Sequence, residues 1–171
     1  MHRVYIHKLN TPDTGIPAAL DCSVRKMLSG LNLNGDEKIL IKPNFVNDSP
    51  AESGVTTDPR ILRSLIEILR SEGFEDISVG ESSIENTEEV FQALGITKLE
   101  MLGAKVINFD AVQDGWVAVE SPLGLALKRF RVARVARDCD LIISVAKMKT
   151  HWYAGVTLSV NYHGLKAVAC S

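Results

Sequence analysis

The chain of 171 residues contains few cysteines, few aromatic residues and no long apolar run. Its three cysteines, Cys22, Cys139 and Cys170, are far apart and form no C-x-x-C pair. This spacing argues against a zinc or iron–sulfur site built from this chain alone. No apolar segment approaches the roughly 20 residues that a membrane-spanning helix needs. The first ten residues lack the apolar core of a secretory signal, so we expect a cytoplasmic protein with no membrane partner.

Neither acidic nor basic residues dominate the chain, because the formal net charge is only -2. Aromatic residues make up 6% of the chain, and a nucleic-acid-binding protein would normally combine aromatics with a basic face, so no nucleic-acid partner is expected. Local charge is uneven: residues 67–100 carry nine acidic and two basic side chains, and residues 128–149 carry seven basic and two acidic ones. The pattern fits two solvated faces or a docking surface for an acidic partner.

The common nucleotide-binding and hydrolase motifs are missing. There is no G-x-x-x-x-G-K-[ST] loop, no G-x-G-x-x-G after the first strand and no G-x-S-x-G elbow. Cys139 lies between Asp138 and Asp140, which would raise the pKa of its thiol and make it a poor nucleophile.

Apolar periodicity instead predicts strands that alternate with helices. The predicted strands cover 3–7, 38–42, 76–80, 104–110 and 140–146, and the predicted helices cover 17–29, 56–73 and 85–95. The second helix is the clearest, because Asp58 suits the N-cap and Pro59 the first helical position. The segment "SPLG" (121–124), between two β-rich runs, predicts a hairpin.

This order predicts a single α/β domain over residues 1–171. Its sheet should be mostly parallel and Rossmann-like, with helices on both faces and a β-hairpin inserted at an edge. In open sheets of this class, ligands bind beyond the carboxyl ends of the strands. The residues that follow each predicted strand are therefore the first candidates for a site.

Polar side chains gather at these strand ends. They are Lys42 and Asn44, then Glu81, Ser82 and Ser83, then Asp110, and finally Lys147, Lys149 and His151. Thr57 and Asp58, at the start of the second helix, should face the same edge, where free N–H groups favour an anion. We therefore predict a site for a small anionic ligand, either a carboxylate or a phosphate.

The residue types suggest roles within this site. Lys42, Asn44, Thr57, Asp58, Glu81, Ser82 and Ser83 are predicted to bind the ligand. Lys147 or Lys149 would hold the anion or act as a base, and His151 would donate and accept a proton. Two lone carboxylates are weak indications of a metal, so no metal site is predicted. Each residue also has a structural interpretation: Lys42 could point to water, and Asp58 could be only an N-cap.

Four segments carry a resemblance to a known family. They are "ILIKPNFV" (39–46), "TTDPRILRSLIEILRSEGF" (56–74), "ISVGESS" (77–83) and "DLIISVAKMKTHWYAGVTLSVNYHGL" (140–165). Together they resemble the family known as domain of unknown function 362. The resemblance implies an α/β domain with a polar site. The residues at the matching positions are Lys42, Asn44, Thr57, Asp58, Glu81, Ser82, Lys147, Lys149, His151 and Asn161. Many relatives carry a ferredoxin-like module, which this chain lacks, so an iron–sulfur cluster would come from a partner and the cofactor is otherwise unknown.

The chain departs from the family pattern in two places. Val160 replaces the lysine of a Lys-Asn-x-x-Gly pattern, while Asn161 and Gly164 remain. The sequence also ends at Ser171, where the family domain normally continues, which suggests a short form or a truncated one. Three hypotheses stay open: an enzyme acting on a small anionic metabolite, a non-catalytic module that docks an iron–sulfur protein, or an incomplete remnant. A homo-oligomer is also left open.

Overall fold

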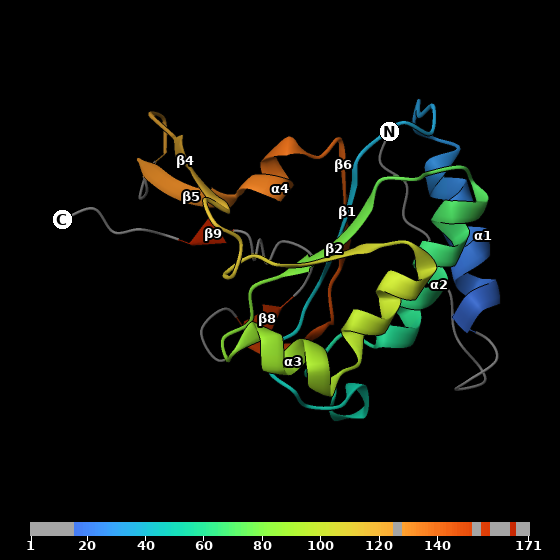
Figure 1. The fold of residues 1–171 in the computed structure, drawn as a ribbon, viewed down its shortest axis with the longest axis horizontal. Helices are drawn as coiled ribbons and strands as arrows, with labels where there is room; N and C mark the ends of the chain where they lie inside the picture. Colours follow the sequence, from blue (N-terminus) through green and yellow to red (C-terminus); the bar gives the residue numbers. More distant parts are fainter. Residues whose placement is uncertain (1–15, 125–127, 152–154, 158–164, 167–171) are drawn as a thin grey trace.

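The computed structural model describes residues 16–124, 128–151, 155–157 and 165–166 (Figure 1). The strand predicted at 3–7 lies outside these residues. Within them, no helix is long and apolar enough to cross a membrane.

A four-stranded parallel sheet forms the centre of the fold. Its strands are β1 (Ile39–Pro43), β2 (Ile77–Glu81), β3 (Lys105–Asn108) and β6 (Leu141–Val145), in the order β3-β2-β1-β6. Ile39 at the start of β1 is in register with Ile77 and Leu141, and all three strand pairs are parallel. The predicted α/β class is confirmed, and the carboxyl ends of β1, β2 and β6 meet at one edge.

Helices cover one face of this sheet, called here the first face. They are α1 (Ile16–Leu28), α2 (Pro59–Ser71), α3 (Thr87–Ala93) and the 3-10 helix η2 (Ile96–Leu102), and α1 packs against α2 (Figure 1). Leu62, Leu65 and Leu69 form a stripe at helical spacing on α2. They share one buried core with residues such as Ile41 and Val79 of the sheet.

The helix ends follow the predicted capping. The Asp58 carboxylate accepts a hydrogen bond of 2.9 Å from the Arg60 N–H, and Pro59 takes the first helical position of α2. Gly73 has φ +95° just past the end of this helix, a conformation that glycine adopts without strain. Asn86 caps α3 and also donates to Glu89.

Among the described residues, fewer elements cover the opposite, second face. They are the short helix α4 (Arg134–Asp138) and the base of an antiparallel sheet made of β4 (Trp116–Glu120), β5 (Arg129–Ala133) and β9 (Leu165–Lys166). The predicted hairpin is therefore present, and Gly124 closes its turn by donating to the Ser121 carbonyl at 2.9 Å.

The predicted place of the hairpin, at an edge of the parallel sheet, is wrong. The hairpin belongs to a separate sheet, and its base packs over the second face. Phe109 packs directly on Gly80, where any Cβ would lie 2.2 Å from the ring, and Trp116 meets Phe109 edge to face. These ring contacts, rather than backbone pairing at a sheet edge, hold the hairpin in place.

Several small elements were not predicted, among them a second hairpin and a 3-10 turn. Lys149–His151 forms β7, which pairs with β8 (Gly155–Thr157) as a second hairpin directly after β6. A 3-10 turn, η1 (Ala51–Ser53), lies between β1 and α2. The hairpin gives Lys149 a defined backbone position beyond the carboxyl end of β6.

Candidate functional site

A buried ion pair lies where β1 and β2 end. The Lys42 ammonium is 2.6 Å from Glu81 Oε1, and the two residues are only 8% and 1% exposed. Lys42 also donates to the Pro43 carbonyl at 2.7 Å. The alternative in which Lys42 points to water is therefore excluded.

The Glu81 carboxylate accepts two further hydrogen bonds from the backbone. Its Oε1 accepts from the Ser82 N–H at 2.8 Å, and its Oε2 accepts from the Phe45 N–H at 3.1 Å. Burial raises the pKa of Glu81, while Lys42 and these N–H donors act in the opposite direction. Burial likewise lowers the pKa of Lys42, and Glu81 opposes that change. The carboxylate thus ties the end of β1 to the end of β2.

A second polar joint connects β1, α2 and β6. The Thr57 hydroxyl accepts from the Asn44 N–H at 2.9 Å and donates to the Val145 carbonyl at 2.7 Å. The Thr57 N–H in turn donates to the Asn44 carbonyl at 3.0 Å. Because Thr57 is 2% exposed and its hydroxyl both accepts and donates, its side chain holds the strand ends together.

Asp58 uses its carboxylate within the start of α2. It accepts from the Arg60 N–H and forms an ion pair of 2.7 Å with the Arg60 guanidinium. These hydrogen bonds from Arg60 are the main reason that the pKa of Asp58 is lowered, and nearby Lys147 adds to the effect. Pro59 has no N–H, and the Ile61 N–H donates to the Asp58 carbonyl at 3.0 Å. At positions 59–61, then, the start of α2 presents no unused N–H to an anion.

Two ammonium groups stand at the edge beyond β6. Lys149 is half-buried, and its ammonium donates to Asn44 Oδ1 and to the Val55 carbonyl. Burial lowers the pKa of Lys149, Glu81 opposes this change, and the positive charge of Lys147 reinforces it. Lys147 is also half-buried and has no hydrogen bond or ion pair to any residue that the structure describes. Among the described residues, the edge therefore combines one hydrogen-bonded lysine with one that makes no direct contact to an acceptor.

The serines after β2 form a smaller cluster with Asp110. The Ser82 hydroxyl donates to Asp110 Oδ2 at 2.7 Å, and Thr87 donates to the same oxygen at 3.3 Å. The Ser83 N–H donates to the Thr87 hydroxyl at 2.9 Å. The Ser83 hydroxyl oxygen is buried and has no hydrogen-bond partner among the described residues.

Most residues of the predicted site meet at this edge. The structure brings together Lys42, Asn44, Thr57, Asp58, Glu81, Ser82, Ser83, Lys147 and Lys149. The backbone of His151 lies in β7, but its side chain is outside the description, and Asn161 lies outside the described residues altogether.

The sequence interpretation missed several contributors, among them the Phe45 N–H, the Val55 carbonyl and the Thr87 hydroxyl. Of these, only Thr87 could have been predicted from the sequence, because it is a polar residue directly after the Asn86 cap. Backbone groups carry no signal of this kind, since every residue has them. Among the described residues, no group of three or more His, Cys, Asp or Glu side chains could hold a metal ion.

The comparisons with known proteins identify the family of the chain. Neither the curated proteins nor the solved structures gave a match. One family, described as "Domain of unknown function (DUF362)", matches residues 39–165, which is more than half of the chain. The match begins at the first residue of β1 and spans every described residue of the site. The chain therefore belongs to the DUF362 family.

Proposed function

We propose that the edge at the carboxyl ends of β1, β2 and β6 binds a small anion, a carboxylate or a phosphate. The observation that carries the proposal is the pair of lysines beyond β6. Lys149 is held by Asn44 and the Val55 carbonyl, while Lys147 beside it makes no hydrogen bond or ion pair to a described residue and interacts with Asp58 only through its charge. Two neighbouring ammonium groups repel each other, and an anion between them would remove that repulsion.

The other residues of the edge then take supporting roles. Glu81 holds Lys42 and the end of β1, and Asn44 orients Lys149. Ser82 and Ser83 would orient the ligand, although the Ser82 hydroxyl already donates to Asp110 and the Ser83 hydroxyl is buried. Thr57 and Asp58 keep α2 in place behind the lysines.

Catalysis at this edge would use Lys149 as the base. Burial lowers the pKa of Lys149, which favours the neutral amine that a base requires. His151, whose backbone follows two residues later in β7, would supply or accept the proton, and Asn161 would contact the ligand. The reaction would then be carried out on a small anionic metabolite, and substituting Lys149 would remove turnover without unfolding the protein.

Calorimetric titration with inorganic phosphate and with succinate tests the binding. We expect saturable binding of at least one of the two. Lys149→Gln should weaken it by about tenfold or more, because a charge-assisted hydrogen bond is lost. Lys98→Gln is the matched control, since Lys98 is an exposed lysine on η2, away from the edge. Equal binding by both variants would rule out the assignment.

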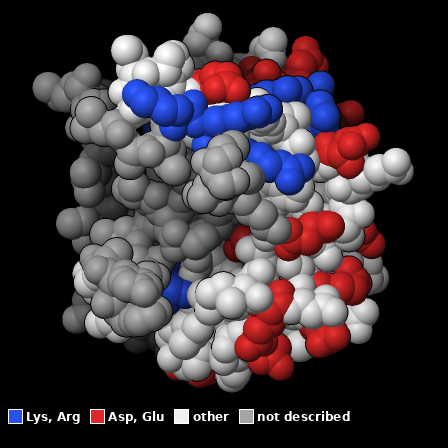
Figure 2. Space-filling model, turned by 90° about the vertical axis from the view of Figure 1, so that its left-hand side faces the viewer, with Lys and Arg blue, Asp and Glu red and all other residues white. Residues whose placement is uncertain are grey.

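A second candidate function is a non-catalytic module that docks an acidic iron–sulfur protein. Its support is the basic band over β5 and α4 (Figure 2), where five exposed cations occur within ten residues. They are Lys128, Arg129, Arg131, Arg134 and Arg137. Binding to a purified ferredoxin-type protein with an acidic surface should weaken with added salt and be lost in Arg131→Glu. Unchanged binding by Arg131→Glu would reject this role for the band.

A further inference from the structure

The second face of the parallel sheet contains a groove that is separate from the strand-end site. It consists of two adjoining pockets of about 240 and 320 Å³, which share Ile107, Val135 and Asp138 as lining residues. The first reaches the amino-terminal starts of β1, β2 and β3, and the second continues toward the base of the hairpin. We call the two together the second-face groove.

The groove exists because the second face has a thin cover. Four helical elements pack on the first face, whereas α4, with five residues, is the only described helix on the second. A parallel sheet normally has both faces covered by helices, so a hollow remains beside α4. The larger pocket alone falls within the range of about 300–1,000 Å³ that small-molecule sites occupy.

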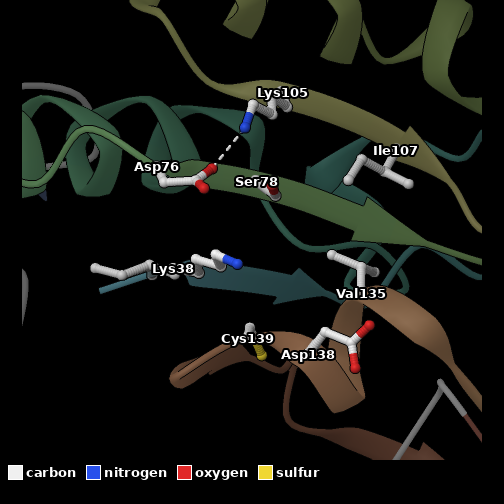
Figure 3. A pocket seen from close by; sticks show the side chains of 9 residues that line it. Lys38, Asp76, Ser78, Lys105, Ile107, Val135, Asp138 and Cys139 are labelled. Carbon is white, nitrogen blue, oxygen red and sulfur yellow. Dashed lines mark hydrogen bonds and ion pairs between the residues drawn. The ribbon is translucent and has the colours of Figure 1, made fainter. Parts of the chain in front are cut away.

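The inner end of the groove holds polar groups without partners. Ser78, the second residue of β2, is 7% exposed, lines the groove and makes no side-chain hydrogen bond to any described residue. Figure 3 shows its side chain between the Lys105–Asp76 pair on one side and Lys38 on the other. Lys38 is exposed, and its ammonium has no partner in the part of the chain that the structure describes. A buried hydroxyl and an ammonium are thus both free to meet a ligand.

The charges around this end favour an anion. Asp76 is bound to Lys105 at 2.6 Å, and Asp138 is bound to Arg137 at the same distance. The Asp140 carboxylate accepts the Lys38 backbone N–H at 2.8 Å. Asp76 and Asp138 thus each have a cation in direct contact, whereas Lys38 makes no hydrogen bond or ion pair with its ammonium to a described residue and acts on Asp138 only through its charge.

The outer end of the groove is apolar. Ile107 and Val135 line both pockets, and Phe109 and Val112 line the larger one. Phe109 is buried and fixed by Gly80 beneath it, so this wall has a defined shape. A ligand with an apolar body would cover these side chains while its charged end reached Ser78.

We propose that the second-face groove binds a small monocarboxylate with an apolar aliphatic or aromatic body. Its carboxylate accepts hydrogen bonds from Lys38 and Ser78, and its body lies against Ile107 and Val135 toward Phe109. The polar end of the groove recognises the carboxylate, and the apolar end recognises the body of the ligand. A short acid lacks the apolar body, and an uncharged alcohol lacks the carboxylate.

The probe for this test is sodium octanoate, titrated by calorimetry into the whole chain, with acetate and octan-1-ol as comparison ligands. Octanoate should bind saturably at concentrations below about 10 mM, and both comparison ligands should bind at least several-fold more weakly. Absence of saturable octanoate binding, or octanol binding as tight as octanoate, overturns the proposal.

Variants locate the binding within the molecule. Lys38→Gln should weaken octanoate binding by about tenfold, and Ser78→Ala should weaken it by several-fold. Lys98→Gln, an exposed lysine outside the groove, should bind octanoate as the parent does. Parent-like binding in Lys38→Gln and Ser78→Ala overturns the assignment. Because Lys38 is exposed and Ser78→Ala is conservative, both variants should fold.

Discussion

Two ion pairs of equal length lie in different regions of this protein. Lys42–Glu81, at the carboxyl ends of the strands, and Lys105–Asp76, at the amino ends, both measure 2.6 Å. The side chains of the first pair are 9% and 2% exposed, and those of the second are 66% and 38% exposed. The two pairs thus have the same distance but differ in solvation. Solvation decides how much each pair contributes to the free energy of unfolding.

The surroundings of the two pairs differ in the same way. Around Glu81, backbone N–H groups complete the coordination of the carboxylate. Around Lys105, Ser78 and Lys38 remain without partners in the described structure. A buried polar group must find partners during folding, whereas an exposed one can rely on water. The Lys42–Glu81 pair is therefore part of the folded core, whereas the Lys105–Asp76 pair lies at the protein surface.

The largest expected effect is on the buried pair. Lys42→Ala should lower the free energy of unfolding by about 3–5 kcal/mol, because Glu81 would be left as an unpaired buried charge. Chemical denaturation followed by circular dichroism measures this. The double variant Lys42→Met with Glu81→Leu should recover a large part of the loss, since neither charge then remains buried. A loss below about 1 kcal/mol in Lys42→Ala would contradict the role of the pair.

Gly80→Ala should have the next largest effect. The new methyl group would lie 2.2 Å from the Phe109 ring, and overpacking of this kind costs about 1–3 kcal/mol. Thermal unfolding of the variant measures the loss. Gly30→Ala is the control, because its Cβ would come no closer than 3.4 Å to another atom. If both substitutions had equal effects, Phe109 would not be packed on Gly80 as described.

Asp58→Ala should cost about 1 kcal/mol at neutral pH, because the N-cap of α2 is lost. The pKa of Asp58 is lowered from its usual value of 3.8, so its contribution is present above that pH. As the pH falls through the lowered pKa, the carboxylate becomes protonated in the folded state and the contribution disappears. Urea unfolding at several pH values should show that the free energies of unfolding of the parent and Asp58→Ala become equal in acid. A constant difference down to low pH would argue against a charged cap.

The smallest effect is expected for the exposed pair. Lys105→Ala should change the free energy of unfolding by less than about 1 kcal/mol, because water solvates both charges. Urea unfolding at low and high salt measures this, and high salt should reduce the difference further. A loss comparable to that of Lys42→Ala would remove the distinction between the two regions.

Local patterns predicted most of the central architecture. The predicted strands at 38–42, 76–80 and 140–146 each lie within one residue of the observed β1, β2 and β6. Asp58 with Pro59 marked the start of α2, since capping depends on neighbouring residues alone. By contrast, β7 and β8 were missed, because a strand of three residues has too few positions to show alternation.

Candidate site residues were predicted better than their contacts. Lys42, Glu81 and Lys149 could be selected because strand ends of a parallel sheet share an edge. The pairing of these residues could not be predicted, since it depends on which strands are neighbours and on how deeply each side chain is buried. The hydrogen bond from Lys149 to the Val55 carbonyl depends on a backbone group of a loop, which no side-chain pattern reveals.

The sequence by itself determined the alternation of strands and helices, the caps of α2 and α3 and the set of polar residues at one sheet edge. These follow from interactions between residues close in the chain. The tertiary structure alone decided that Lys42 is buried while Lys105 is exposed, that the hairpin lies over the second face, and that Ser78 lies at the inner end of a groove. Those outcomes depend on which surfaces meet in space, and the packing of Phe109 on Gly80 shows how one close contact between distant residues settles such a choice.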